Sequence, residues 1–415
     1  MKEDLTGNQI VIVGFARQGR AFARFAAENG AKVIVSDLGS QEQLRKSMQE
    51  LHDLDIEYVL GDHPMSLLDG TDLLVISGGV PADLPLVTAA RQLGINISND
   101  SQEFAQRSPA TVVGITGSAG KTTTTALLGE MARVSGRRTW VGGNIGRPLI
   151  ADLDQMQPGD LVVQELSSFQ LEIWQHSPAV AAVLNITPNH LDRHKSMADY
   201  ADAKANILRY QDKTDIAVLS ADDPGALRLA PLVQGRLRFF SIEREVRDGA
   251  FVRDGVVWLR SPAGQETAVL PVAGIKLRGR HNLYNVCAAV LLADSVDVPV
   301  TAMAEAITSF KGVPHRLELV ETIKGVQYIN DSIATAPERS LAALASFNEP
   351  LVLLAGGKDK NMVWDSWVSQ VAAQVKQVIL FGALADMLLE RLQHEKSRQG
   401  SALRISRVDD LPQAV

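Results

Sequence analysis

The stretch GITGSAGKTTTT at residues 114–125 narrows the possible folds of this chain more than any other segment. It follows the β-branched run TVV and leads into a helical pattern, so it predicts a strand, a glycine-rich turn and a helix in succession. Glycines let the backbone approach phosphate oxygens closely, and a helix N-terminus adds the positive end of its dipole. We therefore predict a phosphate-binding loop within an α/β domain.

The residues of this loop suit a nucleoside triphosphate and Mg²⁺. Lys121 can reach the terminal phosphates, and the Thr122 hydroxyl can hold the metal. The strict G-x-x-x-x-G-K-[ST] pattern is not met, because Ile115 occupies the first glycine position. A glycine-rich turn that binds nothing is the alternative. The expected nucleotide-binding residues are Gly117, Ser118, Ala119, Gly120, Lys121, Thr122 and Thr123.

Short β-branched runs alternate with helical patterns along most of the 415 residues, which predicts an α/β fold with parallel sheets and crossover helices. A prior of roughly 150 residues per domain suggests about three domains. We expect a Rossmann-like N-terminal domain at 1–107, a central P-loop domain at 108–312 with a parallel sheet and a small antiparallel part, and a Rossmann-like C-terminal domain at 313–415. The chain ends on a predicted strand, LRISRV, and the start of a helix, so we expect this third domain to be incomplete.

Hairpin signals occur at two places. Asp-Gly pairs at 248–249 and 254–255 are flanked by apolar residues and predict tight turns in the antiparallel part. The stretch LELVETIKGVQYIND at 317–331 predicts a hairpin that opens the third domain.

Composition excludes several classes of protein. The net charge of −7 argues against a nucleic-acid or anionic-membrane partner. No apolar run approaches the roughly 18 residues that cross a bilayer, and the first residues lack a signal-peptide pattern. The single cysteine, Cys287, excludes an intramolecular disulfide and a cysteine-based zinc site. We expect a cytoplasmic monomer that binds neither nucleic acid nor membranes.

The N-terminal stretch VIVGFARQGRAF at 11–22 is similar to a dinucleotide-binding turn, although Ala16 replaces the middle glycine and leaves Gly14 and Gly19. Asp37 ends the second predicted strand, where an acidic residue would meet a ribose hydroxyl. NAD binding, binding of another nucleotide and a tight turn without a ligand all remain open. A second nucleotide site beside a triphosphate site suggests a nucleotide-tagged substrate.

Three features after the loop are candidates for metal and charge chemistry. Glu165 ends the predicted strand LVVQEL, where a metal-binding acid would lie beside the nucleotide. NITPNHLDRH places His190, Asp192 and His194 just past another strand, and these histidines could equally cap or pack. A zinc site is disfavoured because no third ligand has suitable spacing. Lys204 lies on a predicted helix, where a lone lysine is usually solvated.

Taken together, these motifs resemble the Mur ligases. The segments occur in the order found in that family, and the similarity spans nearly the whole chain: GITGSAGKTTTT, GNIGRP, ELSSFQLE, NITPNHLDRH, HNLYNV, GVPHRLELV, NDSIAT and LLAGGKDK. Within the family, ELSSFQLE and AGGKDK are most similar to the members that use ATP to add D-glutamate to UDP-N-acetylmuramoyl-L-alanine, a peptidoglycan precursor.

The resemblance implies a role for each candidate. Lys121 and Thr122 would hold the ATP phosphates and Mg²⁺, Glu165 would be a further ligand of that metal, and His190 would bind a second Mg²⁺. Lys204 matches a lysine that the family converts to a carbamate with CO₂. The remaining implied contacts are with ATP at Asn285, Arg316 and Asp331, with the UDP-substrate at Gly14, Phe15, Ala16, Asp37, Ser77, Gly79, Asn144 and Ser167, and with D-glutamate at Thr335 and Lys360.

The implied reaction passes the γ-phosphoryl group of ATP to the alanyl carboxylate, and the amine of D-glutamate then displaces phosphate. The chain departs from the family pattern at Ile333, where many members carry lysine, at Asn189 and at Gly78. Another Mur-type ligase that adds L-alanine, a diamino acid or polyglutamate remains an alternative. A P-loop kinase acting on a small molecule and a nucleotide-binding protein without catalysis are the others.

Overall fold

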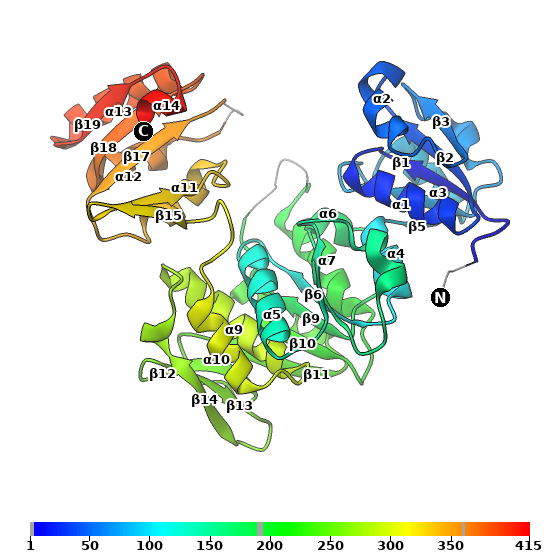
Figure 1. Cartoon of the computed structure of the whole chain (residues 1–415), viewed down its shortest axis with the longest axis horizontal. Coiled ribbons are helices and arrows are strands. Elements are labelled where there is room, and N and C mark those ends of the chain that lie inside the picture. The colour runs from blue at the N-terminus through cyan, green and yellow to red at the C-terminus, as the bar shows by residue number, and fades with distance from the viewer. Residues whose placement is uncertain (1–3, 189–193, 359–361) are drawn as a thin grey trace. The chain divides into compact units, whose positions relative to one another are not determined.

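The computed structural model of the chain describes residues 4–188, 194–358 and 362–415 (Figure 1). Its internal contacts divide it into two compact units. The first holds Met1–Ile275 and Leu283–Phe310, and the second holds Lys276–Asn282 and Lys311–Val415. The division into three domains at 107/108 and 312/313 stays a prediction.

The first unit begins with a five-stranded sheet in the order β3-β2-β1-β4-β5, parallel throughout. Its central strand β1 has the sequence QIVIV, and the four apolar residues after Gln9 are buried because helices cover the sheet. The carboxyl ends of β2, β1 and β4 therefore lie next to one another. The elements are β1 (Gln9–Val13), α1 (Arg17–Glu28), β2 (Lys32–Asp37), α2 (Gln41–Gln49), β3 (Ile56–Leu60), β4 (Leu73–Ile76), α3 (Pro85–Gln92), β5 (Asn96–Ser98) and α4 (Asp100–Arg107).

A nine-stranded sheet follows, in the order β14-β13-β12-β11-β10-β9-β6-β8-β7. It is parallel from β12 to β7 and antiparallel from β12 to β14, which confirms the predicted mixed α/β class. Its strands are β6 (Thr111–Thr116), β7 (Thr139–Gly143), β8 (Leu161–Glu165), β9 (Val180–Val183), β10 (Ile216–Ser220), β11 (Arg236–Ser241), β12 (Gly249–Arg253), β13 (Val256–Arg260) and β14 (Glu266–Pro271). Its helices are α5 (Lys121–Val134), α6 (Ser168–Leu171), α7 (Met197–Arg209), α8 (Pro224–Leu227), α9 (Arg280–Asp294) and α10 (Val300–Ser309), with the 3₁₀ helix η2 (Leu149–Gln155).

The two Asp-Gly pairs behave differently. Asp254 and Gly255 form the two-residue turn between β12 and β13, with φ of 50° and 70°. Gly249 instead begins β12, which pairs in parallel with β11, so the prediction of a hairpin at 248–249 is wrong. A Cβ at position 249 would lie 1.7 Å from the carbonyl oxygen of Phe239. This glycine permits close approach of two strands rather than a reversal of the chain.

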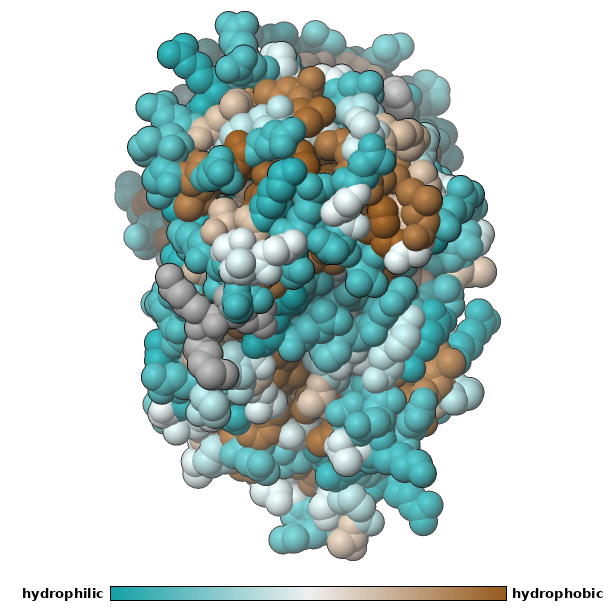
Figure 2. Space-filling view, turned by 90° about the vertical axis from the view of Figure 1, so that its right-hand side faces the viewer, coloured by the Kyte–Doolittle hydropathy of each residue, from teal (hydrophilic) through white to brown (hydrophobic). Residues whose placement is uncertain are grey.

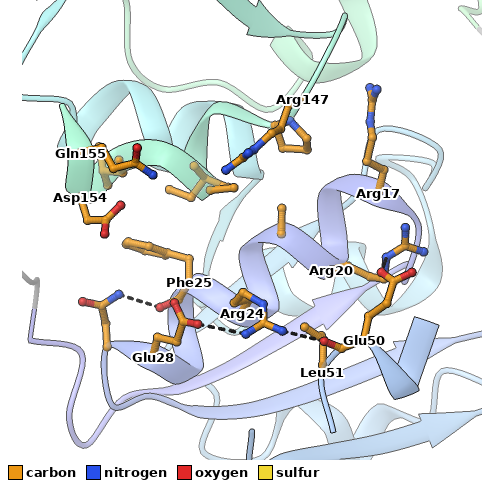
Figure 3. Close-up of a pocket in the computed structure, with 16 residues that line it drawn as sticks. Arg17, Arg20, Arg24, Phe25, Glu28, Glu50, Leu51, Arg147, Asp154 and Gln155 are labelled. Carbon is orange, nitrogen blue, oxygen red and sulfur yellow. Dashed lines mark hydrogen bonds and ion pairs between the residues drawn. The ribbon is translucent and has the colours of Figure 1, made fainter. Parts of the chain in front are cut away.

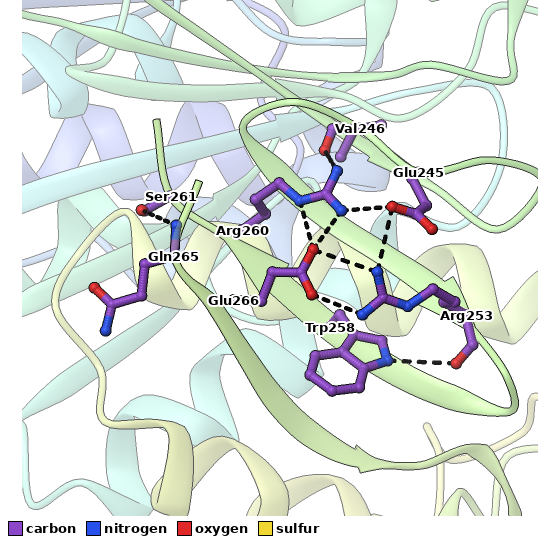
Figure 4. A network of polar contacts seen from close by, with 8 residues as sticks. All are labelled: Glu245, Val246, Arg253, Trp258, Arg260, Ser261, Gln265 and Glu266. Atoms are coloured by element: carbon purple, nitrogen blue, oxygen red, sulfur yellow. Dashed lines mark hydrogen bonds and ion pairs between the residues drawn. The ribbon is translucent and has the colours of Figure 1, made fainter. Parts of the chain in front are cut away.

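The antiparallel strands carry a network of charges (Figure 4). The Glu266 carboxylate accepts hydrogen bonds from Arg253 Nη2 at 2.6 Å and Arg260 Nε at 2.9 Å. These two guanidinium groups lower the pKa of Glu266 to about 2. The Arg253 guanidinium also lies over the Trp258 ring, 4.8 Å from its centroid. The network joins β12, β13 and β14 on a surface where ion pairs each contribute little to stability.

One hydrophobic core joins the first sheet to part of the second. Phe22 of α1, Phe104 of α4 and Leu153 of η2 belong to the same buried cluster. Side chains from α1 and η2 thus pack in one apolar cluster, which holds α1 against η2.

The second unit has its own core and two small sheets. The hairpin of β15 (Glu318–Ile323) and β16 (Val326–Asn330) is antiparallel, which confirms that prediction. The second sheet is parallel, in the order β17-β18-β19. The remaining elements are β17 (Leu351–Gly356), β18 (Val375–Phe381), β19 (Arg404–Arg407), α11 (Pro337–Leu344), α12 (Asp365–Gln374), α13 (Ala385–Gln399) and α14 (Leu411–Ala414).

The short segment Lys276–Asn282 belongs to this second unit although the chain on both sides of it belongs to the first. Arg278 donates hydrogen bonds to Glu349 Oε1 at 2.8 Å and to Gln327 Oε1 at 2.7 Å. Its guanidinium also lies 5.2 Å from the centroid of the Phe347 ring. Three contacts thus hold this segment to residues that follow it by 49 to 71 positions.

The surface shown in Figure 2 is mostly hydrophilic, with its hydrophobic residues in separate patches. Among the described residues, no helix combines the length and the apolar character that a membrane span requires.

Candidate active site

The glycine loop joins β6 to α5, as predicted. Gly120 precedes the first residue of α5 and has a φ of +84°, in the left-handed region that favours glycine. A Cβ on Gly120 would lie 2.2 Å from Asn285 Oδ1, so α9 packs closely on the loop. The structure therefore brings Asn285, predicted as an ATP contact, to the loop itself.

Residues from β9 and α7 hold the loop in shape. Asn185, which follows β9, accepts a hydrogen bond from the Ala119 N–H at 2.8 Å through Oδ1, and its backbone carbonyl accepts one from the Ser118 N–H at 3.0 Å. The Ser118 hydroxyl donates to the Thr187 carbonyl at 2.9 Å and lies 3.0 Å from the Tyr200 hydroxyl. Asn185 and Tyr200 were not among the predicted site residues. Asn185 begins the segment NITPNHLDRH, but its hydrogen bonds to the loop depend on β9 lying beside β6, which the sequence does not show.

Two lysines converge on one carbonyl of the loop. Lys121 Nζ donates to the Gly117 oxygen at 2.8 Å, and Lys204 Nζ donates to the same oxygen at 3.0 Å. Lys204 is 1% exposed, and its ammonium lies 4.6 Å from the centroid of the Tyr200 ring. Burial holds the pKa of Lys204 well below its usual value, and the charge of Lys121 lowers it further, whereas Glu165 acts in the opposite direction. Lys204 is thus no ordinary solvated helix lysine.

Glu165 lies at the carboxyl end of β8 and is 2% exposed. Its Oε1 accepts a hydrogen bond from Asn144 Nδ2 at 2.9 Å, whereas its Oε2 is buried and has no hydrogen-bond partner among the described residues. A buried carboxylate oxygen without a partner is costly unless a cation binds it. Oxygen ligands are those that Mg²⁺ prefers, so this oxygen fits the role of a metal ligand. Thr122, the other predicted ligand of that metal, is the second residue of α5.

Two predicted site residues, His190 and Lys360, lie outside the described residues. The second histidine of the motif, His194, is described. His194 is buried, stacks on Phe169 with ring centroids 5.1 Å apart, and has Nε2 2.9 Å from the Ser168 hydroxyl. Packing, one of the alternatives from the sequence, is its observed role. Within the part of the chain that the structure describes, no group of three or more His, Cys, Asp or Glu side chains could hold a metal ion.

The predicted UDP-substrate residues of the first sheet lie together at the carboxyl ends of its strands, where α/β sheets bind ligands. Gly14, Phe15 and Ala16 form the turn between β1 and α1. Asp37 Oδ2 accepts a hydrogen bond from the Phe15 N–H at 2.7 Å, and Ser77 Oγ donates to the Gly14 carbonyl at 2.8 Å. Asp37 Oδ1 accepts from the Gly39 N–H at 2.7 Å, so this carboxylate braces the turn. The exposed Gly79 follows β4 in the same cluster of turns.

Asn144 and Ser167 lie at the corresponding end of the second sheet. Asn144 follows β7, and its N–H donates to the Glu165 carbonyl at 2.8 Å. The Ser167 hydroxyl caps α6 by accepting from the Gln170 N–H at 3.3 Å. Both predicted residues therefore lie near Glu165, the last residue of β8.

The second unit contains Arg316, Asp331 and Thr335. Asp331 is half-buried and accepts a hydrogen bond from the Leu317 N–H at 3.0 Å. Burial raises the pKa of Asp331, and the nearby charges of Arg316 and Arg339 lower it. Thr335 is exposed just before α11. Contacts of these residues with ATP and with D-glutamate stay predictions.

Comparison with known proteins identifies the class. Residues 115–293 match the Mur ligase middle domain, and residues 8–99 match the MurD-like N-terminal domain of Mur ligases. Together with the relatives described next, these matches show that the chain belongs to the Mur ligase family.

The relatives that it matches along nearly its whole length are UDP-N-acetylmuramoylalanine–D-glutamate ligases. The one from Symbiobacterium thermophilum is 41% identical over 97% of this chain and 88% of its own. The one from Pelotomaculum thermopropionicum is 39% identical over 95% of this chain and 87% of its own. The solved structure of UDP-N-acetylmuramate-alanine ligase from Thermotoga maritima has the same fold, with a TM-score of 0.57 at 20% identity over 98% of this chain and 91% of that chain.

Proposed function

We propose that this protein is an ATP-dependent ligase that adds D-glutamate to UDP-N-acetylmuramoyl-L-alanine through an acyl phosphate, in the synthesis of peptidoglycan precursors. The observation that carries the proposal is the arrangement at the glycine loop. Lys121 and the buried Lys204 meet at the Gly117 carbonyl, and Glu165 lies near enough for its charge to act on Lys204. Relatives named for this reaction are up to 41% identical to the chain.

The chemistry explains why ATP is needed. A carboxylate is a poor acylating agent because oxide is a poor leaving group. An oxygen of the alanyl carboxylate forms a bond to the γ-phosphorus of ATP while the bond to the β–γ bridging oxygen breaks and ADP leaves. The amine of D-glutamate then attacks the acyl carbon, loses a proton and displaces phosphate. Lys121 and the N–H groups of the loop orient the phosphates and neutralise the charge that develops on them.

Thr122 and Glu165 would hold one Mg²⁺, and His190 would bind a second. A carbamate on Lys204 would add a further metal ligand. Glu165 suits this role because its Oε2 is buried without a partner among the described residues. The Lys204 ammonium would repel a cation, whereas reaction of its neutral amine with CO₂ gives an anionic oxygen ligand. When bound, Mg²⁺ supplies positive charge for the phosphate oxygens.

The two substrates to be joined would bind to different parts of the chain. The turns that contain Phe15, Asp37 and Ser77 would hold the UDP group, and Thr335 and Lys360 would hold D-glutamate. Arg316 and Asp331 would contact ATP from the second unit. ATP and UDP-linked precursors are cytoplasmic metabolites, so we place the enzyme in the cytoplasm. We also expect it to act as a monomer.

Release of phosphate from ATP tests the proposal. The protein is incubated with ATP, Mg²⁺ and UDP-N-acetylmuramoyl-L-alanine, and with D-glutamate, L-glutamate, L-alanine, a diamino acid or no amino acid. We expect release with D-glutamate alone, matched one to one by an amide product. Release with a different amino acid would indicate another Mur-type ligase. A stable phosphoester formed without any amino acid would indicate a small-molecule kinase and contradict the proposal.

A further inference from the structure

A single side chain links the UDP-substrate turn to the segment that positions Glu165. Arg17 is the first residue of α1, directly after the turn Gly14–Ala16. Its Nη1 donates a hydrogen bond to the carbonyl oxygen of Gly146, which is 129 residues further along the chain. Gly146 lies between β7 and η2, in the segment 144–147 that also contains Asn144.

Asn144 completes the connection. Its N–H donates to the Glu165 carbonyl at 2.8 Å, and its Nδ2 donates to Glu165 Oε1 at 2.9 Å. The second of these bonds anchors Oε1 of the Glu165 side chain and leaves Oε2 as the oxygen without a hydrogen-bond partner among the described residues. Hydrogen bonds therefore run from the start of α1 through the segment 144–147 to the carboxylate that fits the metal.

Arg17 differs from the other arginines of α1 in the residues to which it bonds. Residues of both α1 and η2 line a surface cavity of about 480 Å³, and this lining includes Arg17, Arg20, Arg24 and Arg147 (Figure 3). Arg20 lies within 3.2 Å of Glu50 and donates to Ser47 at 2.7 Å, so its bonds stay within the first sheet and its helices. Of the arginines of α1 that line the cavity, Arg17 is the one that bonds to the segment 144–147 within the described part of the chain.

A buried carboxyl group adds an electrostatic reason for this placement. Asp100, at the start of α4, is 4% exposed, and its Oδ1 has no hydrogen-bond partner among the residues described. Burial raises the pKa of Asp100 to about 7, and the charge of Arg17 opposes that rise. The Arg17 guanidinium therefore donates to the Gly146 carbonyl, and its charge also acts on the Asp100 carboxyl group.

We propose that Arg17 is a positioning residue that couples occupancy of the UDP-substrate turn to the orientation of Glu165. A ligand that orders the start of α1 orders Arg17, and through Gly146 and Asn144 it restricts Glu165 to the rotamer that presents Oε2 to the metal. This inference rests on the proposed function. It predicts that the UDP-substrate and Mg²⁺–nucleotide strengthen each other's binding, because such coupling is reciprocal.

The test compares Arg17→Gln with the wild type, the conservative variant Arg17→Lys and the matched control Arg20→Gln, which removes a guanidinium one turn further along the same helix. Calorimetry measures binding of a non-hydrolysable ATP analogue with Mg²⁺, with and without saturating UDP-N-acetylmuramoyl-L-alanine. We expect the UDP-substrate to tighten analogue binding at least about fivefold in the wild type and in Arg20→Gln, and not in Arg17→Gln. Arg17→Lys should restore part of the effect, because its ammonium can still donate to a carbonyl. The Mg²⁺ concentration for half-maximal ligation should rise on the order of 10-fold in Arg17→Gln.

The outcomes separate this inference from the function on which it rests. Equal coupling in Arg17→Gln and the wild type would overturn it, and so would weaker UDP-substrate binding with the coupling intact, since Arg17 would then be a plain substrate contact. Thermal unfolding of each variant identifies a general loss of structure, which would lower both affinities together. A wild-type chain that binds neither ligand would refute the proposed function as well.

Discussion

Lys204 is the residue whose environment departs furthest from what its sequence position suggests. A lysine on a helix is normally solvated, yet this one is 1% exposed, shares the Gly117 carbonyl with Lys121 and lies over an aromatic ring. Burial is the main cause that lowers its pKa, so more of the amine is neutral at a given pH than in an exposed lysine, and the neutral amine is the form that reacts with CO₂.

We expect Lys204→Ala to lower ligation on the order of 100-fold or more, because a ligand of the metal is lost. Short carboxylates such as acetate should restore part of the activity by occupying the space that the side chain leaves. The control is Lys213→Ala, which removes an exposed lysine just after the same helix and should leave turnover unchanged. Unchanged turnover in Lys204→Ala would remove this residue from the mechanism.

The same side chain gives a dependence on pH. Its pKa is lower in the folded chain than in the unfolded chain, so protonation is less favourable after folding, and the stability due to the neutral amine declines as the pH falls from the unfolded value towards the folded one. Acid also reverses a carbamate. Activity of protein prepared without bicarbonate should therefore recover on adding bicarbonate, and less so at lower pH.

At the scale of elements, the contact between β11 and β12 depends on one glycine. A Cβ at Gly249 would meet the Phe239 carbonyl oxygen at 1.7 Å, within the parallel register of the two strands. Either the strands must separate or the backbone must shift, and both lose hydrogen bonds of the ladder.

Gly249→Ala should therefore lower the free energy of unfolding by about 2 kcal/mol or more, as measured by urea denaturation. The matched variant is Gly264→Ala: Gly264 has a φ of +81°, but a Cβ there meets nothing within 4 Å. That substitution should cost about 1 kcal/mol from backbone strain alone. Equal losses for the two variants would mean that crowding at Phe239 has no energetic effect.

The elements themselves were largely predictable, and their exceptions have physical causes. The strand, loop and helix at 111–134 follow from β-branched residues, glycines and a helical pattern that agree with one another. Asp and Gly at 248–249 do not form a hairpin turn. Asp248 accepts hydrogen bonds from Arg236 and Arg238, each at 2.9 Å, and Gly249 lies against Phe239 of β11. Local sequence does not distinguish these two uses of glycine.

The site was less predictable than the fold. Motif spacing placed Lys121, Thr122 and Glu165, but it gave no reason to expect the burial of Lys204 or the roles of Asn185 and Tyr200. Those depend on which strands are neighbours: β9 lies beside β6, so residues after β9 reach the loop. Asp37 is a second example, since its carboxylate binds two backbone N–H groups of nearby turns, a role that its position at the end of a strand does not reveal.

At the scale of the whole molecule, the resemblance to the Mur ligases carried more information than any local pattern. Eight short segments in a fixed order predicted the family that the relatives show at up to 41% identity. The division into units was harder to foresee, because the chain passes from the first unit to the second at 275/276, returns at 282/283 and leaves again at 310/311. The segment between the first two crossings joins the second unit through bonds of Arg278 to residues 49 and 71 positions further along, which local sequence does not show.

This interrupted path has a consequence for anyone who handles the protein. If a protease cleaves after Phe310, the fragment that begins at Lys311 is still clasped by Lys276–Asn282 of the other fragment, through Arg278 and its partners Glu349 and Gln327. The nicked preparation should elute from a sizing column as one species and separate into two bands only on a denaturing gel. Arg278→Ala removes these hydrogen bonds, so the two fragments of the nicked variant should associate more weakly and elute separately from the column. If nicked wild-type protein separates without denaturant, the segment does not hold the two fragments together.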